Sequence, residues 1–225
     1  MANYYQYKVL KNADAVFSIT EKICNSVKER YDIPVILNKV GLNLKNIDKN
    51  GKYDYLITIS NWSVVKSPFK YIELMKKLPN YLLIMGGNWV DDNFKEEFKN
   101  KIIEENVNII LKEHLTETEK YDLLSHAKVL IRFEEKERGI GIGPIEALET
   151  LTPVIVNDDL GISLDVEKYG LGLVIKNWDY SVIPNFLKDL ESNEYRLNII
   201  ENIKKYIKDN SWSKHCEILI SPFEK

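Results

Sequence analysis

The sequence predicts an α/β fold built on one parallel β-sheet, and three observations support this prediction. Short apolar runs alternate with stretches of helical periodicity along most of the chain. The apolar runs are rich in Ile, Leu and Val and lack strict polar alternation, which is typical of strands buried on both faces. A glycine-rich segment lies between one such run and a helical stretch, where open α/β sheets bind their ligands.

Length and composition limit the class of protein. The chain of 225 residues is long enough to bury a core, and its 44% hydrophobic and 29% charged residues argue against disorder. The formal net charge of −3 gives no electrostatic bias toward nucleic acid or an anionic membrane. No apolar run approaches the roughly 20 residues of a membrane span, and the N-terminus lacks the apolar core of a signal peptide. We therefore expect a cytoplasmic protein with no nucleic-acid partner and no transmembrane segment.

The first 50 residues are predicted to form a short N-terminal segment that packs on the main domain. Ser18 and Glu21 have capping-box spacing, which predicts a helix that runs to about Arg30. The candidate strands of this segment are Ala15–Ser18 and Pro34–Leu37. The polar stretch Asn43–Lys52 is the candidate linker. These features divide the chain into a segment over residues 1–50 and a domain over residues 51–225.

Six apolar runs predict the strands of the main sheet. They are Tyr55–Ile59, Tyr81–Met85, Val107–Leu111, Val129–Phe133, Pro153–Val156 and Leu173–Ile175. Helical patterns lie between them at residues 67–78, 91–105, 117–127 and 144–150. Thr116 and Glu119 have capping-box spacing at the start of the third helix. Strands that alternate with helices predict a parallel sheet with right-handed connections.

After the last predicted strand, the pattern is helical to the end of the chain. The predicted segments are Tyr180–Leu190, Glu194–Lys208 and a last helix from about Ser211. The three histidines and two cysteines have no metal-ligand spacing, so we expect neither a metal site nor a disulfide.

The segment Arg138–Glu149 is chemically the most informative part of the sequence. It follows a predicted strand and opens a helix, and Pro144 is predicted at the first helical position. Gly139, Gly141 and Gly143 leave backbone N–H groups free to approach a ligand at the positive end of the helix. This arrangement is the general one for holding phosphate.

A structural interpretation of this segment stays open. Three glycines also suit a tight strand-to-helix turn, and Glu146 in the first helical turn interacts favourably with the helix dipole. The two interpretations are compatible, because a carboxylate also accepts hydrogen bonds from the hydroxyls of a ribose or a sugar. The spacing is not G-x-G-x-x-G and no Walker lysine follows. Lys66, after the first main-domain strand, is either a phosphate-binding cation at a helix start or a surface lysine.

Together these residues resemble glycosyltransferase family 4, the retaining GT-B enzymes that use nucleotide sugars. Gly139-Ile-Gly-Ile-Gly-Pro-Ile-Glu-Ala-Leu, followed by Pro153-Val-Ile-Val, resembles that family's E-G-F-G-x-x-x-x-E-A-M-A-x-G-x-P-V-I signature. Further segments resemble the family in the same order; they begin at Ala13, Ile59, Leu83, Gly170 and Asn210. The resemblance implies a Rossmann-like parallel sheet with helices on both faces, as in the C-terminal GT-B domain. The N-terminal segment would be a short α/β remnant of the first domain.

The resemblance also implies roles for individual residues. Glu146 would bind the ribose hydroxyls of the nucleotide, and Lys66 would bind the diphosphate. Backbone N–H groups of the loop Gly139–Gly143, which includes Ile140 and Ile142, would contact the donor sugar and phosphate. Residues around Lys112–Leu115 would border the base.

The chain departs from the family signature at several positions. The first signature glutamate falls on Arg138, with Glu137 one residue earlier, and the arginine that accompanies the phosphate-binding lysine falls on Asn61. Leu151 replaces the glycine before Pro-Val-Ile. From the resemblance, with Arg138 at the position of the signature glutamate, we predict Lys66 and Arg138 as catalytic residues. The predicted donor-binding residues are Glu137, Asn61, Glu146 and the glycine loop.

The implied function is transfer of a sugar from a nucleotide-diphosphate sugar to an acceptor, with retention and without a metal or another cofactor. The alternative is a non-catalytic nucleotide-sugar-binding or protein-interaction subunit. The segment before the predicted domain is far shorter than the family's acceptor-binding domain. A homo-oligomer or a separate acceptor-binding protein is therefore an expected partner.

Overall fold

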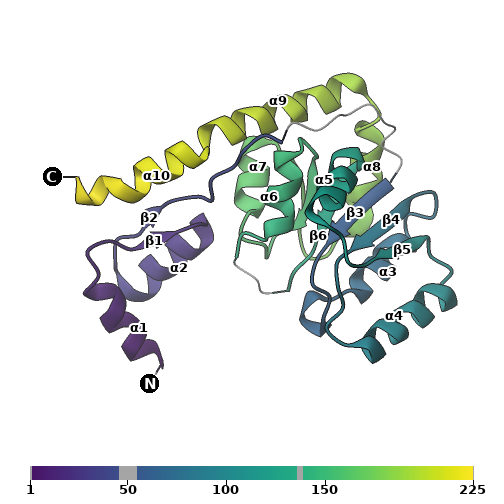
Figure 1. Cartoon of the computed structure of the whole chain (residues 1–225), viewed down its shortest axis with the longest axis horizontal. Helices are drawn as coiled ribbons and strands as arrows, with labels where there is room; N and C mark the ends of the chain where they lie inside the picture. Colours follow the sequence, from purple (N-terminus) through teal and green to yellow (C-terminus); the bar gives the residue numbers. More distant parts are fainter. Residues whose placement is uncertain (1, 46–54, 136–138, 225) are drawn as a thin grey trace.

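A computed structural model describes residues 2–45, 55–135 and 139–224 of the chain (Figure 1). Its centre is a six-stranded sheet in which every neighbouring pair is parallel, with the strand order β5-β4-β3-β6-β7-β8. The strands are β3 (Tyr55–Ile59), β4 (Leu82–Gly86), β5 (Ile109–Lys112), β6 (Val129–Arg132), β7 (Val154–Asn157) and β8 (Gly172–Ile175). This is the strand order of a doubly wound Rossmann sheet. The predicted fold class and all six predicted strands are confirmed.

Helices flank this sheet. They are α3 (Phe69–Met75), α4 (Asp92–Glu104), α5 (Glu117–His126), α6 (Ile142–Glu149), α7 (Ser163–Tyr169), α8 (Ile183–Asp189) and α9 (Asn193–Asp209). Helix α6 contacts α5 and α9, helix α9 also contacts α7, and α3 contacts α4. The sequence analysis did not predict α7. In the part of the chain that the structure describes, no helix has both the length and the apolar character needed to cross a membrane.

The predicted capping box at the start of α5 is confirmed. The Thr116 hydroxyl accepts a hydrogen bond from the Glu119 backbone N–H, and the Glu119 carboxylate accepts one from the Thr116 backbone N–H. Two N–H groups that the first helical turn leaves without partners are satisfied in this way.

Buried aromatic side chains fix the carboxyl ends of the central strands. Trp62 and Tyr71 are fully buried and meet edge to face, with ring centroids 5.6 Å apart. The Trp62 indole donates to the Gly86 carbonyl at 2.9 Å. The Tyr71 hydroxyl accepts from the Phe133 backbone N–H at 3.1 Å and from the Thr58 hydroxyl at 3.1 Å. These hydrogen bonds link the ends of β3, β4 and β6. They also give partners to buried polar groups, which would otherwise be unsatisfied.

The N-terminal residues form a separate small sheet. It consists of the parallel strands β1 (Phe17–Ser18) and β2 (Ile36–Leu37), flanked by α1 (Ala2–Lys11) and α2 (Glu21–Tyr31). Helix α1 was not predicted from the sequence. The predicted start of α2 at Ser18 was wrong, because Ser18 pairs in β1 with Leu37. The N-cap is Thr20, whose hydroxyl accepts from the Ile23 backbone N–H at 3.3 Å.

The chain that follows β2 contacts the helices around the main sheet. Figure 1 shows α9 followed by α10 (Trp212–Ile220), which extends over the N-terminal elements. The Leu42 N–H donates to the Asn210 carbonyl at 2.9 Å, and the Lys39 ammonium pairs with Asp165 of α7 at 2.6 Å. The predicted domain boundary at residue 50 lies outside the described residues and stays a prediction.

Candidate functional site

A cavity of about 440 Å³ opens at the carboxyl ends of the central strands β3 and β6. At this position the strand order of the sheet reverses, and doubly wound sheets leave a crevice there. The lining residues are Ile59, Ser60, Asn61, Lys66, Gly87, Asn88, Leu115, Lys120, Arg132, Gly141, Ile142, Gly143 and Glu146.

Most of the predicted site residues meet in this cavity. Those that line it are Asn61, Lys66, Gly141, Ile142, Gly143 and Glu146. Ile140 is buried instead, and the Gly139 carbonyl accepts a hydrogen bond from the Gly161 N–H at 2.8 Å. Glu137 and Arg138 lie outside the described residues, so their predicted roles stay predictions.

The glycine segment turns the chain from β6 into α6. Gly141 is the N-cap of α6, and its φ of 68° is one that residues with a Cβ rarely adopt. The helix begins at Ile142, so Pro144 is its third residue, and the prediction that Pro144 is the first was wrong. At the third position the missing N–H of Pro144 still costs no intrahelical hydrogen bond, because the first helical turn leaves that N–H without a partner. Backbone N–H groups at the positive end of α6 therefore lie at the cavity.

Glu146 reaches the cavity from the second turn of α6, not from the first turn as predicted, since α6 starts four residues before it. Its carboxylate pairs with the Lys120 ammonium of α5 at 2.6 Å. Both side chains are partly buried, with 15% of Glu146 and 23% of Lys120 exposed. The sequence analysis did not select Lys120, because it is one of many lysines on polar helix faces and only the fold brings it to Glu146.

Lys66 is the last residue of a short 3₁₀ helix, η1 (Val64–Lys66), and lies before α3 rather than at its start. Its ammonium contacts the Glu134 carboxylate at 2.9 Å. The lysine side chain is 26% exposed and that of Glu134 is 2% exposed. Lys66 is therefore held at the cavity by a buried carboxylate, unlike a freely solvated surface lysine.

Arg132 is a cavity residue that the sequence analysis missed. It ends β6 and is 6% exposed. Its Nη1 donates to the Ile59 carbonyl at 3.2 Å, and its Nη2 pairs with the same Glu134 oxygen that Lys66 contacts. The sequence did carry a signal for Arg132, which is a charged residue in an otherwise apolar predicted strand. A buried charge must be paired, so such a residue indicates a polar site.

Tyr121 of α5 is close to two carboxylates of α6, Glu146 and Glu149. Burial raises the pKa of the Tyr121 hydroxyl, and the nearby Glu149 and Glu146 carboxylates raise this pKa further. The hydroxyl therefore stays protonated and donates to Glu149 at 3.2 Å. Glu149 in turn accepts from the Asn43 backbone N–H at 2.8 Å, which anchors the start of the predicted linker to α6.

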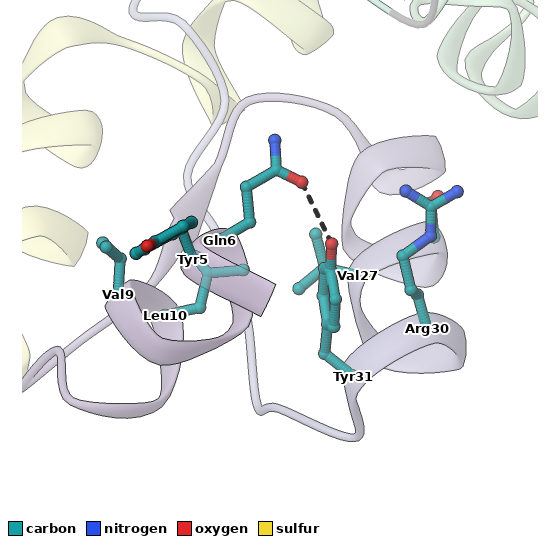
Figure 2. A pocket seen from close by; sticks show the side chains of 8 residues that line it. Tyr5, Gln6, Val9, Leu10, Val27, Arg30 and Tyr31 are labelled. Carbon is teal, nitrogen blue, oxygen red and sulfur yellow. Dashed lines mark hydrogen bonds between the residues drawn. The ribbon is translucent and has the colours of Figure 1, made fainter. Parts of the chain in front are cut away.

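A second cavity, of about 490 Å³, lies between α1 and α2 in the N-terminal segment. Figure 2 shows its lining, in which the Tyr31 hydroxyl donates to Gln6 at 3.1 Å and the other contacts are mainly apolar. We place the candidate site at the main sheet, because three cations and a carboxylate converge there. Within the described residues, no three His, Cys, Asp or Glu side chains gather as a metal site.

Comparisons with known proteins agree with this fold. Residues 42–206, more than half of the chain, match the family described as glycosyl transferases group 1. Glycosyltransferase 1 domain-containing protein 1 of Xenopus tropicalis is 23% identical over 195 residues, which cover 84% of this chain and 54% of that protein.

Solved structures of glycosyltransferases are also similar. A variant of S. aureus TarM, in complex with fondaparinux, alpha-GlcNAc-glycerol and UDP, has a TM-score of 0.80 at 17% identity. The similarity covers 100% of this chain and 46% of TarM. A glycosyltransferase from Rickettsia africae also has a TM-score of 0.80, at 15% identity, over 99% of this chain and 67% of that one.

The chain thus spans about half the length of TarM and of the Xenopus tropicalis relative. The similar structures show the fold of a single GT-B-type domain. Because the family match extends over more than half of the sequence, this chain belongs to the glycosyl transferases group 1 family.

Proposed function

We propose that the cavity binds a nucleotide-diphosphate sugar and that the chain takes part in transferring the sugar to an acceptor. One observation carries the proposal. The N-terminus of α6, the Lys66 ammonium and the Glu146 carboxylate face one cavity at the carboxyl edge of the sheet. The TarM structure contains UDP, which supports a nucleoside diphosphate as the ligand.

The ribose, the diphosphate and the base of the donor each have a matching group in this cavity. The Glu146 carboxylate accepts hydrogen bonds from the ribose hydroxyls, and its partner Lys120 holds it in place. The diphosphate lies between Lys66 and the backbone N–H groups of Gly141–Gly143. Leu115, which follows β5, borders the base. Asn61 also lines the cavity and offers an amide to the donor.

The reaction breaks the bond between the anomeric carbon and a diphosphate oxygen and forms a bond from this carbon to the acceptor oxygen. The acceptor hydroxyl loses its proton, and the nucleoside diphosphate leaves with the electron pair. Lys66 and the N-terminus of α6 stabilise the charge that develops on the leaving group. Retention, metal independence and contributions of Arg138 and Glu137 to the sugar contacts are part of this proposal.

Calorimetric titration with UDP, GDP and their sugars tests the binding step. We expect one nucleotide family to bind and Glu146→Ala to weaken it by about tenfold or more, because a charge-assisted hydrogen bond is lost. Glu117→Ala is the matched control, since Glu117 is an exposed glutamate on α5. Failure of the wild-type chain to bind any of these ligands would overturn the proposal.

The length of chain shared with relatives favours a second candidate function. The chain spans about half of TarM and of the Xenopus tropicalis relative, and a GT-B active site is a cleft between two domains. The second candidate is a non-catalytic nucleotide-sugar-binding subunit that needs an acceptor-binding domain, in the same or another polypeptide. Release of free sugar from a bound nucleotide sugar by this chain would favour the transferase. Tight binding without any turnover, also with added acceptors, would favour the subunit.

A further inference from the structure

We propose that Arg132 binds the diphosphate of the donor together with Lys66, and that Glu134 positions both cations. This inference rests on the proposed function. The juxtaposition that carries it is a buried arginine at the end of β6 and a lysine of η1 that contact one carboxylate oxygen at the cavity.

The position of Arg132 is the first argument. It ends β6, beside β3, at the centre of the sheet, and it lines the same cavity as Lys66 and the N-terminus of α6. An arginine that is 6% exposed is costly to bury unless its charge is paired. The Glu134 carboxylate supplies this pair. Glu134 is itself held, since its backbone N–H donates to Asn157 Oδ1 at 2.9 Å and its carbonyl accepts from Asn157 Nδ2 at 2.7 Å.

The hydrogen-bonding capacity of Arg132 is the second argument. A guanidinium carries five N–H donors. In residues 2–45, 55–135 and 139–224, its hydrogen bonds engage Ile59 O through Nη1 and Glu134 through Nη2. Arg132 lines the cavity, and a guanidinium presents its donors in a planar fork that suits phosphate oxygens.

The shared contact of both cations with Glu134 is the third argument. The described side chains that line the cavity include the cations Lys66, Lys120 and Arg132 and the carboxylate Glu146. Glu146 pairs with Lys120, and Glu134 contacts both Lys66 and Arg132. Two cations thus share one carboxylate at the place where the diphosphate is proposed to lie. Glu134 therefore holds both cations at one cavity, where the diphosphate of the donor would contact both of them.

The test compares the affinities of diphosphate and monophosphate ligands. Affinities of UDP, UMP, GDP and GMP are measured by calorimetry for the wild-type chain and for Arg132→Gln. We expect Arg132→Gln to weaken the preferred diphosphate by about 10- to 100-fold, because hydrogen bonds to a charged group are lost. The monophosphate of the same base should weaken much less. A merely structural arginine would lower the thermal midpoint and weaken both ligands by the same factor.

Two further variants sharpen this test. Lys39→Gln removes another largely buried cation, paired with Asp165 away from the cavity, and should leave the affinity ratio of diphosphate to monophosphate unchanged. Asn61→Arg in the Arg132→Gln background returns a guanidinium to the same cavity and should restore part of the ratio. If Arg132→Gln does not fold, Arg132→Lys serves instead, with the ratio expected to fall because the planar fork is lost.

The two proposals fail in different ways. If the wild-type chain binds none of the four nucleotides, the proposed function fails and this inference fails with it. If the wild-type chain prefers a diphosphate and Arg132→Gln or Arg132→Lys keeps the wild-type ratio, only the role of Arg132 is overturned.

Discussion

Leu151, between α6 and β7, has a left-handed backbone conformation with a φ of 58°. Residues other than glycine rarely adopt this conformation, which costs roughly 1–2 kcal/mol. The surrounding turn holds it there, because the Leu151 N–H donates to Leu148 O at 2.8 Å and the Thr152 N–H donates to Ala147 O at 2.9 Å. At this position the glycosyltransferase family 4 signature has glycine. The chain therefore keeps the turn geometry without the residue best suited to it.

We predict that Leu151→Ile lowers the free energy of unfolding by about 1 kcal/mol or more, because branching at Cβ makes a positive φ less accessible. Chemical denaturation followed by circular dichroism measures the change. Leu111→Ile is the control, since Leu111 is also partly buried but lies in β5, where branched residues are favoured. Equal stability losses in the two variants would contradict the prediction.

At the scale of elements, the loop after β7 connects the N-terminal segment to the glycine loop. The Lys22 ammonium, from α2, donates to the Asp158 carbonyl and to the Leu160 carbonyl, the latter at 3.0 Å. In the same loop, the Gly161 N–H donates to the Gly139 carbonyl at 2.8 Å. The small sheet and the candidate site are therefore joined through one loop.

Lys22→Met keeps the length of the side chain and removes its donors. We expect the free energy of unfolding to fall by about 1–2 kcal/mol, because two carbonyls lose a charged partner. Hydrogen exchange should accelerate at Gly161, whose N–H depends on the position of this loop. Lys28→Met is the matched control, as Lys28 is an exposed lysine of the same helix. Unchanged exchange at Gly161 would show that the contact does not hold the loop.

At the scale of the whole molecule, α10 packs on the extended chain that follows β2. The His215 ring contacts the Lys39 carbonyl at 2.7 Å, and the Asn38 amide donates to the His215 carbonyl at 3.2 Å. Gly41 lies against Trp212, where a Cβ would meet the ring at 2.5 Å and the Trp212 Cα at 2.8 Å. Close packing of this helix therefore requires glycine at position 41.

Gly41→Ala should displace α10 and lower the free energy of unfolding by about 1–3 kcal/mol through overpacking. Hydrogen exchange over residues 212–220 measures the displacement. In the double variant with Trp212→Ala, we expect partial recovery relative to Trp212→Ala alone, because the ring contacts disappear and the contact with Cα remains. Wild-type exchange in Gly41→Ala would contradict this packing.

Several apolar side chains of the whole molecule remain exposed. Tyr5 and Val9 of α1 are 64% and 70% exposed, and Phe223, after α10, is 61% exposed. Exposed apolar groups of this kind are consistent with an interaction surface. The expectation of a homo-oligomer or a separate acceptor-binding protein stays a prediction.

The sequence predicted the elements of the main sheet well, because strands such as Val129–Arg132 and Val154–Asn157 are buried throughout and each begins with three consecutive apolar residues. It predicted α2 with the wrong cap, since the pairing of Ser18 in β1 is a tertiary contact. Helix α1 was not predicted, and from Tyr4 to Lys11 none of its side chains is buried. Local sequence patterns predict an element poorly where contacts with distant residues decide its structure.

The sequence by itself determined the parallel α/β fold and the place of the glycine loop between a strand and a helix, because strand burial and glycine spacing are local properties. Only the tertiary structure decided that Lys120 pairs with Glu146 and that Arg132 shares Glu134 with Lys66. Lys66 and Glu134 are distant in the sequence, and Lys120 and Glu146 come from different helices. The electrostatic interaction within each pair depends on the short distance between the two charges. Only the folded chain sets this distance, for example where β3 lies beside β6.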